Sequence, residues 1–515
     1  MLMEEIEDRP DRHFSVEHLR ANLGRRTTRG GAIMVSSQAL KFVISMASTV
    51  VLARLLTPQD YGLVGMVVVV TGFISLFKSM GLSTATIQQA EINDRQVSTL
   101  FWINVALGII TMLLAFAVAP LIALFYHVPQ LTWITMALAV GFLFSGLTVQ
   151  HEALLKRQMR FFALAAIEIG ALVSSISVAI IMAWRGAGYW SLVGGQLTMA
   201  VAQAAGVWIA CRWRPGRAVR NSGVRSMLAF GGNVTGNTVF NYFSRNLDNL
   251  LIGRVWGAQQ LGLYAKAYQL LLLPIEQMAT PLDGVAVTSL SKLTETPERY
   301  RQAYLRILEK LAMLTMPGVA FMIVTSDWLV RLVLGPQWSE TAIIFALLGI
   351  VGLVEPVGNT MGWLMISQGR ARHILQIGVM DGLIAVVSIV AGLPWGAVGV
   401  AASYSLIGLC LRKPLLFWFV CRVGPVRLSD FYSAIAPSAC ATVCVLAALM
   451  LFRRWGIVSD PLPGLVISFA ITVATALLLL FILPGGRLAL RDAKDLLPHL
   501  LAPAQRSGKR SNPPA

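Results

Sequence analysis

The sequence predicts an all-α protein that crosses a membrane many times. Hydrophobic residues make up 56% of the 515 residues and charged residues only 13%, whereas about a quarter of an ordinary soluble chain is charged. Apolar runs recur along the chain, and each is long enough to cross about 30 Å of hydrocarbon. The runs are continuously apolar, without the alternation of a membrane β-strand. These observations exclude an ordinary cytosolic enzyme and predict about 14 transmembrane helices.

The first run follows a polar tail with six arginines. It is too long for the apolar core of a signal peptide, so we expect it to remain in the protein as the first helix. The runs at 62–79 and 226–253 are the least regular, which leaves a count of twelve or thirteen open. In chain order, we expect spans near 31–53, 62–79, 99–119, 131–150, 163–184, 189–210, 226–253, 261–285, 308–327, 341–365, 373–393, 396–420, 432–452 and 462–483.

Basic residues are distributed unevenly between the two sides of the membrane. With the amino terminus inside, 29 of the 42 Lys and Arg residues fall in cytoplasmic segments and six in external ones. This asymmetry follows the positive-inside rule and predicts that both termini are cytoplasmic. It also explains the net charge of +17 through contact with anionic lipid head groups, so we expect no nucleic-acid partner.

Sequence signals for catalysis, metal or cofactor binding are absent. The chain contains no GxxxxGK[ST] phosphate-binding loop and no HExxH motif. Its five cysteines include no CxxC pair, and its six histidines are scattered. The predicted external loops are all shorter than about fifteen residues, and the largest internal loop, at about 286–307, is too short for a domain. We therefore expect a protein that is not an enzyme and holds neither metal nor cofactor.

Three pairs of similar sequence segments predict an internal duplication. Arg54, Gln59, Gly62 and Leu63 recur 200 residues later as Arg254, Gln259, Gly262 and Leu263. Gln158-Met-Arg160 pairs with Gln368-Gly-Arg370, and Gly186-Ala187 pairs with Gly396-Ala397. Repeats six spans apart have the same orientation, so they would form two six-helix lobes related by a pseudo-two-fold axis along the membrane normal.

The duplication divides the chain into six parts. Two further helices follow the second lobe. The predicted parts are a cytoplasmic tail (1–30), an N-lobe (31–210), a basic cytoplasmic linker (211–225), a C-lobe (226–420), helices 13 and 14 (421–484) and a basic cytoplasmic tail (485–515).

Charged residues inside the spans are the candidate functional residues, since each costs about 2.5–3.5 kcal/mol to insert. The cations Lys41, Arg245 and Lys266 could line a wet cavity that receives an anionic substrate. The carboxylates Asp248, Glu355 and Asp381 could bind a coupling ion, and Glu168 is a weaker candidate of the same kind.

Each of these side chains also has a structural interpretation. Arg245 and Asp248 are three residues apart and could form an intrahelical pair. Lys266 could extend outward to the interface, and the remaining charges could form interhelical pairs. Arg54 and Arg254, at the external ends of the first span of each lobe, could be gate residues or bind head groups, with head groups favoured.

Several motifs resemble bacterial polysaccharide flippases of the multidrug/oligosaccharidyl-lipid/polysaccharide exporter superfamily. The segment 53–62, which reads ARLLTPQDYG, is followed by GLSTATIQ at 81–88. GYWSLV at 188–193, RNLDNLLIG at 245–253 and LGLYAKAY at 261–268 are also similar to that family, and the resemblance covers about residues 30–420. It implies an alternating-access transporter in the bacterial inner membrane. The implied substrate is an undecaprenyl-diphosphate-linked oligosaccharide repeat unit destined for lipopolysaccharide, capsule or exopolysaccharide.

Two other function classes stay open from the sequence. A drug or toxin extruder of the same superfamily would favour a cavity rich in carboxylates. A membrane-embedded polymerase or glycosyltransferase would need a larger extramembrane segment than the predicted loops provide. For the flippase, the expected partners are the lipid-linked substrate and membrane lipids, with a polysaccharide polymerase and a chain-length regulator as further candidates.

Overall fold

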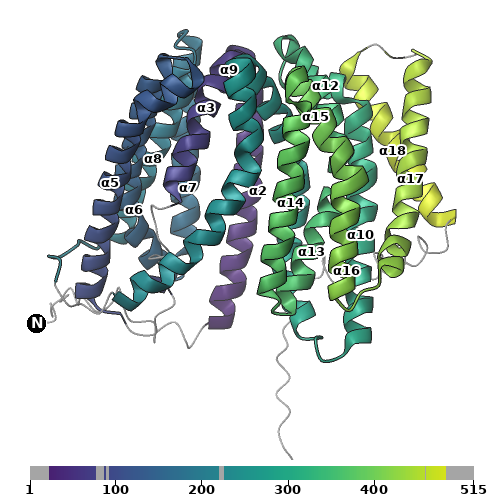
Figure 1. The fold of residues 1–515 in the computed structure, drawn as a ribbon. Coiled ribbons are helices and arrows are strands. Elements are labelled where there is room, and N and C mark those ends of the chain that lie inside the picture. The colour runs from purple at the N-terminus through teal and green to yellow at the C-terminus, as the bar shows by residue number, and fades with distance from the viewer. Residues whose placement is uncertain are drawn as a thin grey trace, which may run out of the picture. The chain divides into compact units, whose positions relative to one another are not determined.

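The computed structural model describes residues 23–76, 86–87, 92–219, 225–456, 458 and 460–482. Within these ranges the chain forms helices joined by short connections, and no strand occurs. Figure 1 shows that most of the long helices run nearly parallel to the helices beside them in the same compact unit. Residues 1–22 and 483–515 lie outside the described residues, as does most of the segment 77–91. The carboxyl-terminal tail predicted at 485–515 is therefore not described, whereas residues 23–30 of the amino-terminal tail predicted at 1–30 already belong to the first helix.

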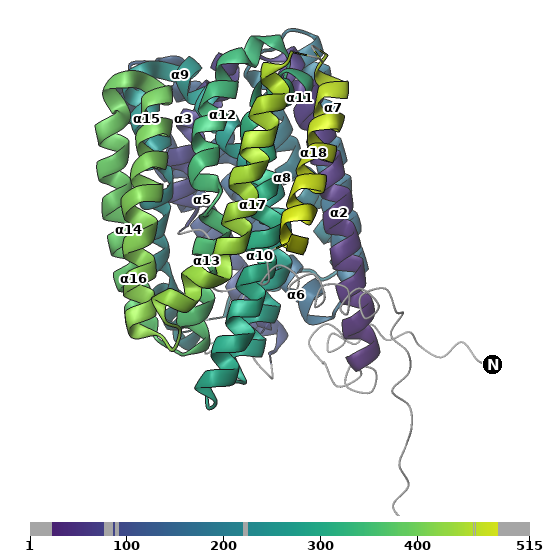
Figure 2. The same cartoon turned by 90° about the vertical axis from the view of Figure 1, so that its right-hand side faces the viewer.

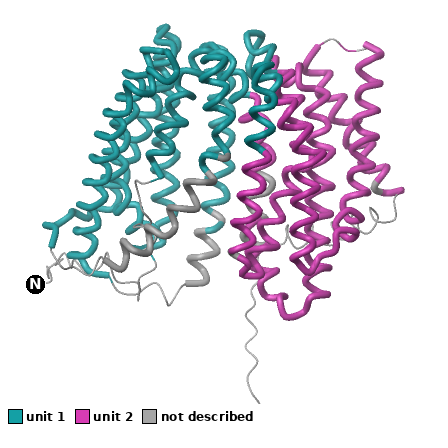
Figure 3. Tube along the Cα trace, in the orientation of Figure 1, with its two compact units in different colours: residues 1–266, 333–341, 385–400 teal, residues 267–332, 342–384, 401–515 magenta. Residues whose placement is uncertain are grey.

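The helices fall into two compact units, coloured separately in Figure 3. Unit 1 comprises residues 1–266, 333–341 and 385–400. Its helices include α2 (Leu23–Leu55), α3 (Pro58–Ser75), α5 (Asp94–Tyr126), α6 (Gln130–Arg157), α7 (Phe161–Trp184), α8 (Trp190–Cys211) and the first part of α9 (Arg225–Ser291).

Unit 2 comprises residues 267–332, 342–384 and 401–515, and Figure 2 shows several of its helices in full. Two short helices, η2 (Pro336–Trp338) and η3 (Leu393–Trp395), lie in segments that belong to unit 1. The remaining helices are α10 (Pro297–Val324), α11 (Ser326–Val333), α12 (Ser339–Gly352), α13 (Glu355–Ser367), α14 (Ala371–Gly392), α15 (Gly396–Ile407), η4 (Gly408–Arg412), α16 (Lys413–Val423), α17 (Leu428–Arg454) and α18 (Pro461–Ile482).

The described part of every predicted span is mainly helical, which confirms the all-α membrane class. In the described part, nine helices are long and apolar enough to cross a membrane, or ten if the bent pair α12–α13 counts as one span. One helical stretch in that count, Arg372–Val423, contains the two predicted spans 373–393 and 396–420. Helix α9 is not in the count but also contains two predicted spans. Helix α9 covers 226–253 and 261–285 with a break at Gly257, where φ is 80°. The exact number of fourteen spans stays a prediction.

The predicted internal loop at about 286–307 is largely helical. Helix α9 continues to Ser291 and α10 begins at Pro297, so only five residues connect them. The segment still connects two predicted spans, and the structure adds that the helices on both sides extend into it. Its first part continues α9, and Pro297 occupies the first turn of the next helix, where its missing N–H is tolerated.

The predicted duplication recurs in the local backbone and contacts. Met159 and Gly369 both have positive φ, at 55° and 67°, and so do Gly186 and Gly396, at 79° and 72°. The arginine after each of the first pair caps the end of another helix. Arg160 donates to the Ala210 carbonyl near the end of α8, and Arg370 donates to the Val423 carbonyl at the end of α16. These equivalent geometries support two repeats of one helical plan.

The first pair of similar segments, 54–63 and 254–263, forms a close crossing between α3 and α9. A Cβ on Gly62 would lie 1.7 Å from the Ala258 carbonyl oxygen, and a Cβ on Gly262 would lie 1.8 Å from the Pro58 carbonyl oxygen. Residues 58 and 258, like 62 and 262, are related by the 200-residue offset. The two contacts are therefore reciprocal, as in an interface about a two-fold axis. Small residues let helix backbones approach closely inside a membrane.

We predict that Gly62→Ala and Gly262→Ala each lower the unfolding midpoint of the purified protein. The added methyl group would overlap a backbone oxygen, and overpacking of this kind costs about 1–3 kcal/mol. Thermal unfolding in detergent measures the effect. Gly170→Ala is the matched control, because a Cβ there meets nothing within 4 Å. Wild-type midpoints for both crossing variants would contradict the close packing.

Candidate functional site

Unit 2 contains a cluster of buried charge around an irregular turn. Between α15 and α16 the backbone forms the π-helical turn η4, which ends at Arg412. Pro414 follows in the first turn of α16. A proline cannot donate to the residue four positions earlier and its ring crowds that carbonyl, which explains a widened turn here. π-Turns inside helices are frequent at functional sites.

The turn places two adjacent cations opposite two carboxylates from other helices. Lys413 Nζ lies 2.9 Å from Glu355 Oε2, at the start of α13. Arg412 lies 3.9 Å from Glu355 and 3.6 Å from Asp381 of α14. Arg412 also donates to the Tyr404 hydroxyl at 2.9 Å. We call Glu355, Asp381, Tyr404, Arg412 and Lys413 the charge cluster.

The formal charges of the charge cluster cancel, but the distances from Arg412 to the two carboxylates are long. Two carboxylates face two cations, so the formal charges cancel. The side chains of Arg412 and Lys413 are 3% and 6% exposed, whereas those of Glu355 and Asp381 are 28% and 40% exposed. The distances from Arg412 to both carboxylates exceed hydrogen-bond length. Polar groups therefore remain that a proton, water or another ligand could satisfy.

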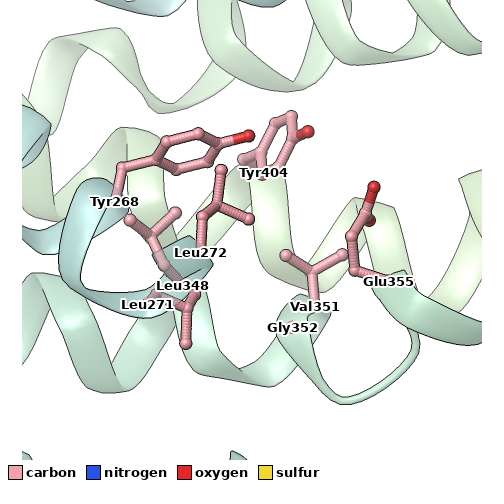
Figure 4. A pocket seen from close by; sticks show the side chains of 8 residues that line it. All are labelled: Tyr268, Leu271, Leu272, Leu348, Val351, Gly352, Glu355 and Tyr404. Atoms are coloured by element: carbon pink, nitrogen blue, oxygen red, sulfur yellow. The ribbon is translucent and has the colours of Figure 1, made fainter. Parts of the chain in front are cut away.

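A pocket opens beside this cluster (Figure 4). The Glu355 carboxylate and the hydroxyl groups of Tyr268 and Tyr404 are its polar groups. The other lining residues are Leu271, Leu272, Leu348, Val351 and Gly352. The cluster thus borders a mostly apolar space through one of its carboxylates.

The structure brings Glu355 and Asp381 together through Arg412 and Lys413, which sequence reasoning had not singled out. A usable signal was present: two consecutive basic residues occupy the apolar run 396–420 and precede a proline. Such charges are costly inside a span and need partners.

Lys41 of unit 1 has an interhelical partner. Its Nζ lies 2.6 Å from Glu168 Oε2, which joins α2 to α7. The side chains are 25% and 34% exposed, so both remain accessible. The pairing that sequence left open for Lys41 is therefore present, and Glu168 is the partner.

The intrahelical pair between Arg245 and Asp248, one of the two interpretations that the sequence left open, does not form in the described chain. Asp248 is buried and accepts hydrogen bonds from the Tyr264 hydroxyl at 2.9 Å and from the Asn249 backbone at 2.8 Å. The Arg245 side chain is exposed instead. The Asp248 carboxylate thus links the two parts of α9 across the break at Gly257. Spacing in the sequence could not reveal Tyr264 as its partner.

Lys266 is buried in unit 1 and does not extend outward to an interface. Its Nζ lies 3.9 Å from the centre of the Tyr61 ring. Tyr61 also meets Trp338 edge-on at 5.5 Å. Trp338 is fully buried and donates to the Ala53 carbonyl near the end of α2 at 2.8 Å, and Gln337 donates to the same oxygen at 2.7 Å.

The two arginines related by the 200-residue offset, Arg54 and Arg254, have different surroundings. Arg54 is exposed, and its side chain passes Gly335. The Arg254 guanidinium lies over the Phe125 ring at 5.6 Å. These residues, with Trp338 and the Gly62–Gly262 crossing, surround the junction of α2 and α3. We call this region the α2–α3 end.

The comparisons with known proteins agree with this architecture. The solved structure of the lipid II flippase MurJ in an inward closed conformation matches with a TM-score of 0.69 at 13% identity, covering 87% of this chain and 98% of that chain. At this identity the match shows a common fold.

Sequence relatives come from polysaccharide biosynthesis. The lipopolysaccharide biosynthesis protein WzxC of Escherichia coli (strain K12) is 25% identical, covering 80% of this chain and 83% of the relative. The teichuronic acid biosynthesis protein TuaB of Bacillus subtilis (strain 168) is 27% identical, with coverages of 71% and 76%. The model of the family described as "polysaccharide biosynthesis protein" matches residues 51–343, more than half of the chain. The chain therefore belongs to this polysaccharide biosynthesis protein family.

Proposed function

We propose that this protein moves a lipid-linked oligosaccharide across the bacterial inner membrane for the synthesis of a surface polysaccharide. The observation that carries the proposal is the family match over residues 51–343 on a many-helix membrane bundle. The shared fold with a protein named as a lipid II flippase supports the same class of substrate. The implied substrate is an undecaprenyl-diphosphate-linked repeat unit, and the implied mechanism is alternating access.

A diphosphate needs positive partners during this passage. Stripping its hydration in hydrocarbon without compensation would be prohibitively costly. Lys41 is a candidate partner, since it is accessible and its ion pair with Glu168 could be exchanged for phosphate oxygens. Arg245 is a second candidate because its side chain is exposed rather than held by Asp248.

Alternating access requires one end of the transporter to be closed while the other is open. The α2–α3 end has the character of a seal, with reciprocal glycine contacts, a buried Trp338 and Lys266 packed on Tyr61. In the proposed topology this end is external. Opening it would separate the α3–α9 crossing and release Trp338 from α2.

The charge cluster suits coupling to an ion gradient. Protonation of Glu355 would remove its attraction for Lys413, leaving Arg412 and Lys413 with Asp381 alone. A transported metal cation is less suited to this place, since two cations of the chain already face the carboxylates. The same balance weighs against a drug extruder whose cationic substrates bind an excess of carboxylates.

We predict that the protein restores surface polysaccharide in a strain lacking its own flippase for that glycan, and that lipid-linked repeat units accumulate inside without it. Extraction of the lipid-linked pool and detection of polymer at the cell surface measure both. If polymer stays absent although the protein is abundant and its own glycan is made, the proposed activity is contradicted.

We predict that Lys41→Glu abolishes export, because it places two carboxylates together and removes a cation from the substrate path. Lys41→Arg should export more than Lys41→Gln. The exchange variant Lys41→Glu with Glu168→Lys separates the two roles. The exchange variant should restore the amount of protein in the membrane through a reversed ion pair. It should recover less than about half of wild-type export. Wild-type export by the exchange variant would assign Lys41 a structural role only.

We predict that Glu355→Gln lowers both stability and gradient-dependent transport, since it leaves the buried Lys413 without its carboxylate partner. Glu355→Gln with Lys413→Gln removes both partners and should recover stability. Transport by this double variant in proteoliposomes should no longer depend on an imposed proton gradient. Normal gradient dependence at normal abundance would remove Glu355 from the coupling mechanism.

A further inference from the structure

The first part of the predicted linker is fastened to unit 1. Residues 211–219, which we call the strap, cross the amino-terminal end of α5. Trp213 Nε1 donates to Asp94 Oδ1 at 2.8 Å, the Gly216 N–H donates to Ser98 Oγ at 2.9 Å, and the Val219 N–H donates to Thr99 Oγ1 at 3.1 Å. In return, Trp102 Nε1 donates to the Gly216 carbonyl at 2.9 Å. A connection without regular secondary structure is thus held along its length.

An aromatic anchor fixes the start of the strap. The Trp213 side chain is buried beside His151, with ring centres 5.2 Å apart, and beside Phe101 at 6.1 Å. His151 in turn stacks on Trp208 of α8, and its Nε2 lies 3.2 Å from the Trp213 carbonyl. Burying this tryptophan fixes the backbone on both sides of it.

The anchored backbone presents its arginines outward. Cys211 and Trp213 are buried, whereas Arg212, Arg214 and Arg217 are exposed. Arg95, the second residue of α5, is also exposed. The neighbouring carboxylate, Asp94, is held by the Trp213 indole. The strap therefore forms a surface on which exposed arginines outnumber the one neighbouring carboxylate among the described residues, and its backbone has a fixed shape.

Trp102 locates this surface with respect to the membrane. It is 46% exposed, it lies within the first turns of the apolar helix α5, and it is hydrogen-bonded to the strap. Exposed tryptophans are typical of the boundary between hydrocarbon and head groups. The arginines of the strap thus lie beside a residue that marks head-group depth.

We propose that the strap is a binding surface for anionic phospholipid head groups. Orientation by the positive-inside rule requires only charge, so it does not explain why this segment is tied down by four hydrogen bonds and a buried indole. Because the backbone is already fixed, the arginines lose only side-chain freedom on binding, and each can donate two hydrogen bonds to a phosphate.

The spacing favours phospholipids over the lipid diphosphate of the proposed substrate. An extended chain advances about 3.3–3.6 Å per residue, so Arg212 and Arg217 can be as far as about 17 Å apart. At the full separation, two phosphates that share a bridging oxygen would engage only part of the row of arginines. Separate head groups in a leaflet match it, and each arginine contributes about a fivefold gain in binding to an anionic surface.

Lipid retention by the full-length protein tests this proposal without measuring transport. Detergent-purified protein is titrated with phosphatidylglycerol or phosphatidylcholine, and bound lipid is counted by native mass spectrometry. The wild type should prefer phosphatidylglycerol. Arg212→Gln, Arg214→Gln and Arg217→Gln together should weaken phosphatidylglycerol binding by about a hundredfold and leave phosphatidylcholine unchanged. The corresponding triple lysine variant should retain most of the preference.

The matched control is Arg185→Gln with Arg331→Gln and Arg454→Gln, which removes three exposed arginines outside the strap and changes the net charge equally. It should keep the wild-type preference. The proposal is overturned if the strap variant binds phosphatidylglycerol like wild type, or if the control loses as much. Retained phosphatidylglycerol binding with loss of an undecaprenyl-diphosphate probe would instead make the strap a substrate-loading surface.

Discussion

The free energy of placing charge in hydrocarbon constrains this molecule more than any other term. A charged side chain in a membrane span needs a partner or water, and the described chain supplies partners from distant segments. Lys41 meets Glu168, Lys413 meets Glu355, Arg412 faces Asp381, and Lys266 lies on Tyr61. The same cost would apply to the diphosphate of the proposed substrate, and we propose that it is met by exchange with the accessible Lys41–Glu168 pair.

The internal duplication gives the fold a second organising feature. The reciprocal contacts of Gly62 and Gly262 fit two similar segments that meet about a local two-fold axis. A contact of this type is built from backbone oxygen and glycine rather than from long side chains. It can therefore close tightly and separate without leaving charged groups unpaired. These properties suit the gate of an alternating-access transporter.

Much of the fold could be predicted from sequence, because continuous apolar runs and basic asymmetry report directly on membrane spans. The candidate site was less accessible. Glu355 and Asp381 were identifiable as costly charges, but their pairing depends on the π-turn before Pro414, which no periodicity reveals. Glu168 is 127 residues from Lys41, and Tyr264 reaches Asp248 only across the Gly257 break. Contacts of this kind are set by tertiary packing.

The central claim is that this chain itself moves a lipid-linked oligosaccharide across a bilayer. The most direct measurement uses proteoliposomes loaded with a fluorescent undecaprenyl-diphosphate oligosaccharide and an impermeant glycosidase outside. With the protein present, cleavage should exceed the half that faces outward at the start and approach completion. Cleavage that stops at the level of protein-free liposomes, with correctly folded protein in the bilayer, would contradict the account.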